Sequence, residues 1–252
     1  MTDQLTERGI VLSTSNLGEY DKRLVILTEN LGKITVFANG ARKQNSRFGA
    51  ASQVFTMGKF MLYPGRNTYT LHGAEIEKSF LALSGDMEQY AAASYVCELT
   101  EYFAQDGLPG KDLLNLLYVT FQQFLSGTMS PDTVRAAFIL KLLHVEGVAP
   151  DMELPEGAEP DRLEKLWLDP EEGHLTADPV GVGRPLVMSS TAIYAFQYIY
   201  SRPIAATYSF KISDRASDEL LYLAEKLVEH HLDRPLRSAR IIQGMRAFRK
   251  NS

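Results

Sequence analysis

The chain has 252 residues, of which 45% are hydrophobic and 23% charged, and this balance is typical of a globular protein with one large or two ordinary domains. Its single cysteine, Cys97, excludes an internal disulfide, so nothing indicates an oxidising compartment. No apolar run approaches the roughly eighteen residues of a membrane span, and the start MTDQLTERG lacks the pattern of a secretory signal. We therefore expect a cytoplasmic protein without a membrane partner.

The net charge of −5 is unevenly distributed along the chain. Residues 1–80 carry ten Lys and Arg against seven Asp and Glu, whereas residues 81–252 carry sixteen against twenty-four. Residues 151–178 hold ten acids and two bases, and residues 234–250 hold six bases and no acid. Two basic regions therefore flank an acidic middle, and charge asymmetry of this kind indicates binding functions better than the total does.

The first forty residues show the two-residue alternation of β-strands. Alternating apolar positions recur in three runs, at residues 10–13, 23–28 and 33–37. The intervening segments, residues 16–18 and 29–32, end in glycine and tolerate positive φ, which predicts a meander of three strands.

Two further strands, residues 54–63 and 68–77, are separated by Pro-Gly-Arg-Asn, which is a hairpin signal. Five short strands within about 70 residues predict a small closed barrel of the OB type, because closure removes the exposed edges of a small open sheet.

Positive charges and an aromatic ring occur together in the third strand, residues 33–37, and in the loop that follows it. The alternation puts Lys33, Thr35 and Phe37 on one face, and residues 40–47 form a basic loop that we expect to be flexible. This combination suits single-stranded nucleic acid, because cations neutralise phosphates and a base can stack on the ring. The candidate DNA-binding residues are Lys22, Arg23, Lys33, Phe37, Arg42, Lys43, Arg47 and Arg66, with Tyr20 as a second candidate for stacking. The alternative interpretation is a solvated charged surface on which Phe37 only ends a strand at the barrel rim.

Near Ser84 the apolar period changes from two to 3.6, which predicts helices. The expected helices cover about residues 92–103, 111–125, 131–143, 189–200 and 213–232, and Ser130 is expected to cap the third. A possible hairpin of residues 166–168 with 174–176 lies in a stretch rich in acids, Pro and Gly. The predicted fold class is α+β with two domains: a five-stranded OB-fold barrel over residues 1–80, and an all-helical domain over residues 81–252 with a small irregular insertion at about 151–184.

The final basic segment has two interpretations that the residues leave open. Arg237, Arg240 and Arg246 form either a second surface for DNA or a partner, or a helix end whose cations complement the helix dipole.

Catalytic and metal-binding patterns are not found in the sequence. None of the five histidines lies four residues from another or beside the cysteine, so we predict no metal and no cofactor. G-x-S-x-G and Walker motifs are absent. The acids of residues 151–178 lie in a Pro-rich stretch that would hold catalytic carboxylates poorly, so a solvated surface is the better interpretation and a hydrolase a distant alternative.

Three segments resemble a known family. Residues 9–43, GIVLSTSNLGEYDKRLVILTENLGKITVFANGARK, followed by Ser46 and Arg47, closely resemble the opening of the RecO family of bacterial recombination mediators and DNA repair proteins. KLLHVEGVAPD, residues 141–151, resembles the helix end that precedes this family's zinc-knuckle region, and PLRS, residues 235–238, resembles its C-terminal signature.

The resemblance implies an OB-fold followed by a helical domain, and a function without an active site. It implies binding of single- and double-stranded DNA, annealing of complementary strands, and help in loading the recombinase RecA onto DNA covered by single-strand-binding protein. The implied protein partners are RecR and the C-terminal tail of single-strand-binding protein, and the implied location is the nucleoid. Some members carry four zinc-binding cysteines after the APD motif, but residues 151–184 contain none, so we expect a metal-free insertion. The alternative function is a protein-interaction adaptor whose barrel binds a protein partner and not DNA.

Overall fold

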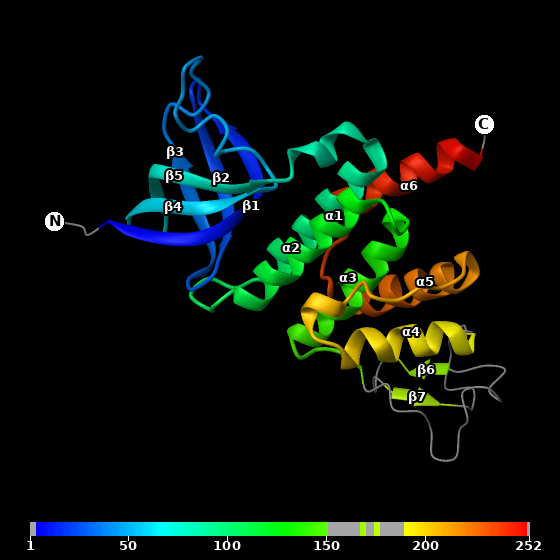
Figure 1. Cartoon of the computed structure of the whole chain (residues 1–252). Helices are drawn as coiled ribbons and strands as arrows, with labels where there is room; N and C mark the ends of the chain where they lie inside the picture. Colours follow the sequence, from blue (N-terminus) through cyan, green and yellow to red (C-terminus); the bar gives the residue numbers. More distant parts are fainter. Residues whose placement is uncertain (1–3, 151–166, 170–173, 177–188, 251–252) are drawn as a thin grey trace. The chain divides into compact units, whose positions relative to one another are not determined.

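The computed structural model describes residues 4–150, 167–169, 174–176 and 189–250 (Figure 1). Within the predicted insertion it describes two short strands, Trp167–Asp169 (β6) and His174–Thr176 (β7), which pair antiparallel. This pairing agrees with the expected hairpin. The remainder of residues 151–184, on which the prediction of an irregular insertion rests, lies outside the described residues.

The N-terminal part forms a closed five-stranded barrel. Its strands are β1 (Leu5–Leu17), β2 (Asp21–Thr28), β3 (Gly32–Ala38), β4 (Thr56–Pro64) and β5 (Tyr69–Ser79), in the order β1-β2-β3-β5-β4 with β4 returning to β1. Only the β3–β5 pair among these is parallel. The long strand β1 pairs with β4 through its first half and with β2 along most of its length, and its register shifts between Val11 and Ser13. Such a bulge bends the strand and helps close the barrel, and the predicted OB-type fold is confirmed.

The barrel interior is filled by apolar side chains from all five strands. They are Val11, Leu24, Ile26, Ile34, Val36, Phe60, Leu62 and Leu71, and Ala41 and Phe48 join them from the segment after β3. In β2, however, Val25 and Leu27 on the opposite face are also buried. A side chain at Gly110, in the segment after the first helix, would lie 2.7 Å from the Leu27 Cδ1 atom. The outer face of the sheet is therefore covered at this end, and β2 is buried on both faces.

Helices follow the barrel, as predicted. They are α1 (Met87–Phe103), α2 (Lys111–Ser126), α3 (Pro131–Val145), α4 (Ser190–Ser201), α5 (Asp214–His231) and α6 (Arg237–Lys250), with short 3₁₀ turns η1 (Leu81–Gly85) and η3 (Ile204–Ala206). The Ser130 side chain accepts a hydrogen bond from the backbone N–H of Thr133, which confirms the predicted cap of α3. The predicted α+β fold class, a barrel followed by helices, is confirmed.

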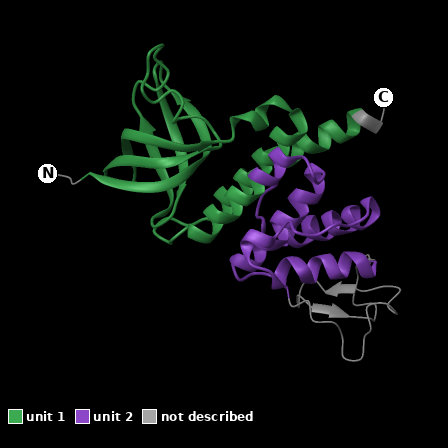
Figure 2. Ribbon diagram, in the orientation of Figure 1, with its two compact units in different colours: residues 1–121, 236–252 green, residues 122–235 purple. Residues whose placement is uncertain are grey.

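The chain divides into two compact units (Figure 2). Residues 1–121 and 236–252 form the first unit, which combines the barrel with α1, most of α2 and α6. Residues 122–235 form the second. The division into domains at residue 80 that the change of period suggests remains a prediction.

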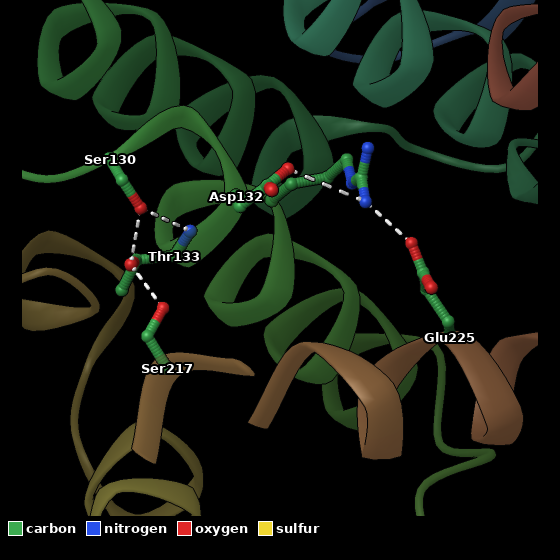
Figure 3. Close-up of polar contacts among 6 residues, drawn as sticks. Ser130, Asp132, Thr133, Ser217 and Glu225 are labelled. Atoms are coloured by element: carbon green, nitrogen blue, oxygen red, sulfur yellow. Dashed lines mark hydrogen bonds and ion pairs between the residues drawn. The ribbon is translucent and has the colours of Figure 1, made fainter. Parts of the chain in front are cut away.

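The second unit is organised around α3, which is buried from Thr133 to Leu143. Thr133 and Ser217 share a hydrogen bond of 2.5 Å between their hydroxyls, and the buried Arg135 forms an ion pair with Glu225, so polar contacts join α3 to α5 (Figure 3). The Lys141 ammonium donates hydrogen bonds to three carbonyl oxygens at the end of α4. Burial lowers the pKa of Lys141.

Candidate nucleic-acid interface

The outer face of β2 and β3 brings Arg23 and Phe37 together. These residues are cross-strand partners, and Phe37 is in turn opposite Thr70 of β5. Arg23 is exposed and its Nη2 atom donates a 3.2 Å hydrogen bond to the hydroxyl of Thr35, while Phe37 is half-buried. The predicted face of alternate residues on β3 is therefore present, with a cation beside an aromatic ring.

The turn between β1 and β2 is fastened to the segment that follows β3. The Arg42 Nη1 atom donates hydrogen bonds to the carbonyl oxygens of Gly18 (3.2 Å) and Glu19 (3.0 Å). The Arg42 backbone N–H donates to the carbonyl oxygen of Tyr20 at 2.9 Å. Both segments lie at one end of the barrel (Figure 1), so Arg42 is held at the β1–β2 turn although it follows that turn by more than twenty residues in the sequence.

Two lysines lie beside this turn. The Lys22 Nζ atom donates to the Ser52 carbonyl oxygen at 3.3 Å, and burial together with the neighbouring Arg42 guanidinium lowers the pKa of Lys22. The Lys43 Nζ atom lies 5.6 Å from the centre of the Tyr20 ring, within cation–π distance. Cations are therefore crowded here, and a bound phosphate would relieve their repulsion.

The basic loop is anchored, contrary to the expectation that it is flexible. Consecutive backbone hydrogen bonds from Lys43 to Gly40, from Ser46 to Lys43 and from Gly49 to Ser46 form a chain of turns. Ala41 and Phe48 are buried in the barrel core, and the Arg47 guanidinium lies 4.7 Å from the centre of the Phe48 ring. Two apolar anchors thus fix the positions of the exposed cations between and beside them.

Arg66 and Lys33 occupy different environments. Arg66 is exposed in the turn between β4 and β5, and Thr70, a short distance further along the chain, lies opposite Phe37. The Lys33 ammonium instead donates a 2.6 Å hydrogen bond to the carbonyl oxygen of Glu101 in the last turn of α1. A lysine in that position satisfies a carbonyl at the end of a helix. The Lys33 ammonium therefore lies at the end of α1, at the opposite end of β3 from Phe37.

Leu17 is an apolar residue at this site that the sequence analysis did not single out. It lies opposite Asp21 at the end of the β1–β2 pair, and Ser15 lies opposite Arg23 two positions away. Side chains two positions apart in a strand share a face, which places Leu17 on the side of Arg23 and Phe37. The two-residue spacing of Leu17 from Ser15 can be read from the sequence. The pairing of Ser15 with Arg23, which relates Leu17 to the cation, is seen only in the structure.

The cations of this region differ from other barrel cations in their acidic neighbours. Arg8 forms an ion pair with Glu77 at 2.8 Å, and Lys59 lies 4.0 Å from Glu75. In the part of the chain that the structure describes, no carboxylate lies within ion-pair distance of the following residues, which we term the barrel cations: Lys22, Arg23, Arg42, Lys43, Arg47 and Arg66. Their positive charge is therefore available to an anionic ligand.

The second predicted surface lies on α6, apart from the β1–β2 turn (Figure 1). Arg237 and Arg240 are exposed and Arg246 is half-buried. A groove of about 650 Å³ beside α6 is lined by Asp86, Met87, Glu88, Ile241, Gly244, Met245 and Phe248. Because two carboxylates line this groove, it is unsuited to phosphate, and a DNA or partner surface on α6 remains a prediction.

Among the residues with described positions, no group of three or more His, Cys, Asp or Glu is placed to hold a metal ion. None of the described helices is long and apolar enough to cross a membrane.

The closed barrel with its OB strand order, followed by helices, defines an OB-fold protein with a helical C-terminal part. Comparison with protein families gives two matches: "Recombination protein O N terminal" over residues 1–80 and "Recombination protein O C terminal" over residues 84–240. The chain belongs to the RecO family, and this membership supports a role in DNA repair and recombination.

Three similar proteins are DNA repair proteins RecO of other bacteria. The DNA repair protein RecO of Desulforamulus reducens is 28% identical over 96% of this chain and 94% of its own length. That of Anaeromyxobacter sp. (strain K) is 29% identical over 95% of this chain and 96% of its own length. That of Alkaliphilus metalliredigens is 35% identical over 57% of this chain and 58% of its own length.

Proposed function

We propose that the chain binds single- and double-stranded DNA through the barrel cations, with little preference for sequence. The observation that carries this proposal is the set of barrel cations without an acidic partner among the described residues, beside Phe37 and Tyr20. Lysine and arginine contacts to phosphates position a protein on DNA without reading its bases. In an OB-fold, the β2–β3 face and the β1–β2 and β4–β5 loops are the usual surface for oligonucleotides.

Annealing of complementary strands follows from the same surface. Cations that screen two phosphate backbones lower the repulsion between the strands and leave the base edges free to pair. We propose that the chain anneals strands in this way and helps load the recombinase RecA onto DNA covered by single-strand-binding protein, together with RecR and the C-terminal tail of single-strand-binding protein. Each of these steps is one of binding and exchange, so we propose a function without catalysis. Family membership supports these finer assignments.

The salt dependence of binding tests the proposal. If about four to six phosphates are neutralised, log affinity for a single strand falls with log salt at a slope of roughly −3 to −4. Replacing Arg42, Lys43 and Arg47 together by Ala is expected to flatten this slope by about 2, because each phosphate contact contributes about 0.7. The measurement is fluorescence anisotropy with a labelled oligonucleotide at several salt concentrations.

A matched control separates the site from total charge. Arg8, Lys59 and Lys111 are three cations of the same unit that each face a glutamate. Their joint replacement by Ala removes the same charge and is expected to leave the slope nearly unchanged. Equal slopes for the two triple variants would contradict the proposed site. Negligible salt-dependent binding by the unmodified chain would favour the adaptor function instead.

A further inference from the structure

The β1–β2 turn carries two large apolar side chains in an unusually open position. Leu17 is 45% exposed and Tyr20 is 47% exposed, although the apolar residues in the middle of β1 and β2 are buried. Both lie next to barrel cations: Leu17 is on the face of Arg23, and Lys43 lies against the Tyr20 ring. We term this pair of apolar side chains the apolar tip.

The apolar tip is held in place before any ligand binds. Gly18, between the two residues, adopts a φ of +57°, which a side chain would disfavour. Arg42 donates side-chain hydrogen bonds to two carbonyl oxygens of the turn, and its backbone N–H donates to the carbonyl oxygen of Tyr20. A rigid apolar surface loses little conformational freedom when a partner stacks on it.

The chemistry of the tip fits the open face of a base pair. An exposed leucine and an exposed aromatic ring beside cations suit a nucleobase whose phosphates lie close by. Within a duplex, neighbouring pairs cover every base face, so the terminal pair is the one with a face exposed. A long single strand would instead be matched by a row of exposed rings, but Phe37, the neighbouring ring on this face, is half-buried.

We propose that the apolar tip stacks on the terminal base pair where a duplex meets a single strand, so that the barrel recognises single-strand–duplex junctions. The barrel cations contact the phosphates of both strands, and the β2–β3 face receives the single strand. This inference rests on the proposed DNA-binding function and adds the substrate class, a junction of the kind that annealing produces.

The test uses a duplex with a single-stranded overhang and 2-aminopurine in the terminal base pair. The unmodified chain is expected to bind this junction more tightly than the unpaired strand, and to change the 2-aminopurine fluorescence on binding. Replacing Leu17 and Tyr20 together by Ser is expected to weaken junction binding by about 5- to 150-fold, the range that stacking of one base corresponds to. The same variant is expected to abolish the fluorescence change.

The control variant replaces Leu81 and Tyr222 by Ser. Each is 45% exposed, and Tyr222 has a lysine, Lys226, near its ring, so the control matches the tip in residue type, exposure and cation contact. It is expected to bind the junction as the unmodified chain does. Unfolding curves that coincide for both variants exclude loss of fold, because all four residues are substantially exposed.

Other outcomes would overturn the inference in distinguishable ways. If single strand and junction bind with normal salt dependence but the Leu17 and Tyr20 variant keeps its junction affinity, the inference fails while the proposed function stands. If the variant keeps junction affinity but loses self-association in sedimentation, the tip contacts a second copy and not DNA. If the unmodified chain binds neither substrate, the proposed function and the inference fail together.

Discussion

Glu98 of α1 connects the N-terminus of α6 to the rest of the first unit, and its replacement should weaken that connection. The Glu98 carboxylate accepts hydrogen bonds from the backbone N–H groups of Arg237 and Ser238, both at 2.9 Å, and from the Ser238 hydroxyl at 2.7 Å. Helix N-terminal N–H groups have no partner within their own helix, and a carboxylate there also interacts favourably with the helix dipole.

We expect Glu98→Gln to destabilise the protein by about 2 kcal/mol at pH 7. The glutamine keeps the shape but offers one acceptor oxygen, so at least one of the three donors is left with a weaker partner, which costs about 1–3 kcal/mol. For a chain of this size the corresponding fall in Tm is about 4–8 °C. The measurement is thermal unfolding followed by circular dichroism.

The effect of Glu98→Gln should depend on pH. Burial alone would raise the pKa of Glu98, but the hydrogen bonds from Ser238 and Arg237 outweigh it and the pKa is lowered. A carboxyl with a lowered pKa in the folded state contributes stability above its unfolded value of about 4.3, and this contribution is lost as the pH falls through the folded value. The difference in stability between the variant and the unmodified chain should therefore be present at pH 7 and become smaller below about pH 4.

Glu75→Gln is the matched control for this prediction, because Glu75 is an exposed glutamate whose nearest basic partner is 4.0 Å away. It is expected to change stability by less than about 0.5 kcal/mol. The reasoning would be refuted if the Glu98→Gln variant were as stable as this control at pH 7. It would also be refuted if the loss of stability caused by Glu98→Gln became larger in acid.

Two further predictions concern the barrel. Gly32→Ala should lower the free energy of unfolding in urea by more than about 3 kcal/mol, because φ is +67° and the new Cβ would lie 2.1 Å from the Gln105 carbonyl oxygen. The control Gly18→Ala, at φ +57° with open space around it, should lower it by only about 1 kcal/mol. Equal losses for the two variants would contradict the clash at Gly32. Lys33→Ala should lower stability by about 1 kcal/mol, because the hydrogen bond to the Glu101 carbonyl oxygen is lost. The same variant should leave the salt slope of DNA binding unchanged. A flatter slope would show that Lys33 belongs to the DNA-binding site.

Sequence periodicity predicted the barrel strands and the helices because it reports a local property. Which residues share a face follows from the geometry of a single strand or helix. Ile34 and Val36, on the face of β3 opposite Phe37, accordingly lie together in the barrel core. Burial of Leu27 could not be read in this way, because it depends on contact of the outer face of β2 with the distant segment at Gly110. The position of Ser130 as a cap was also local, since it depends on the residues that follow at once.

The composition of the candidate site was visible in the sequence, but its arrangement was not. Among the predicted cations, Lys33 in the third strand and Arg42 in the loop that follows it carry the same charge. Closure of the barrel places Arg42 against the β1–β2 turn and directs Lys33 to the end of α1. The sequence by itself determined the barrel, the helices and the positive charge, because these follow from short-range pattern and composition. Tertiary structure alone decided which cations remain open to a ligand, because that depends on contacts between residues far apart in the chain.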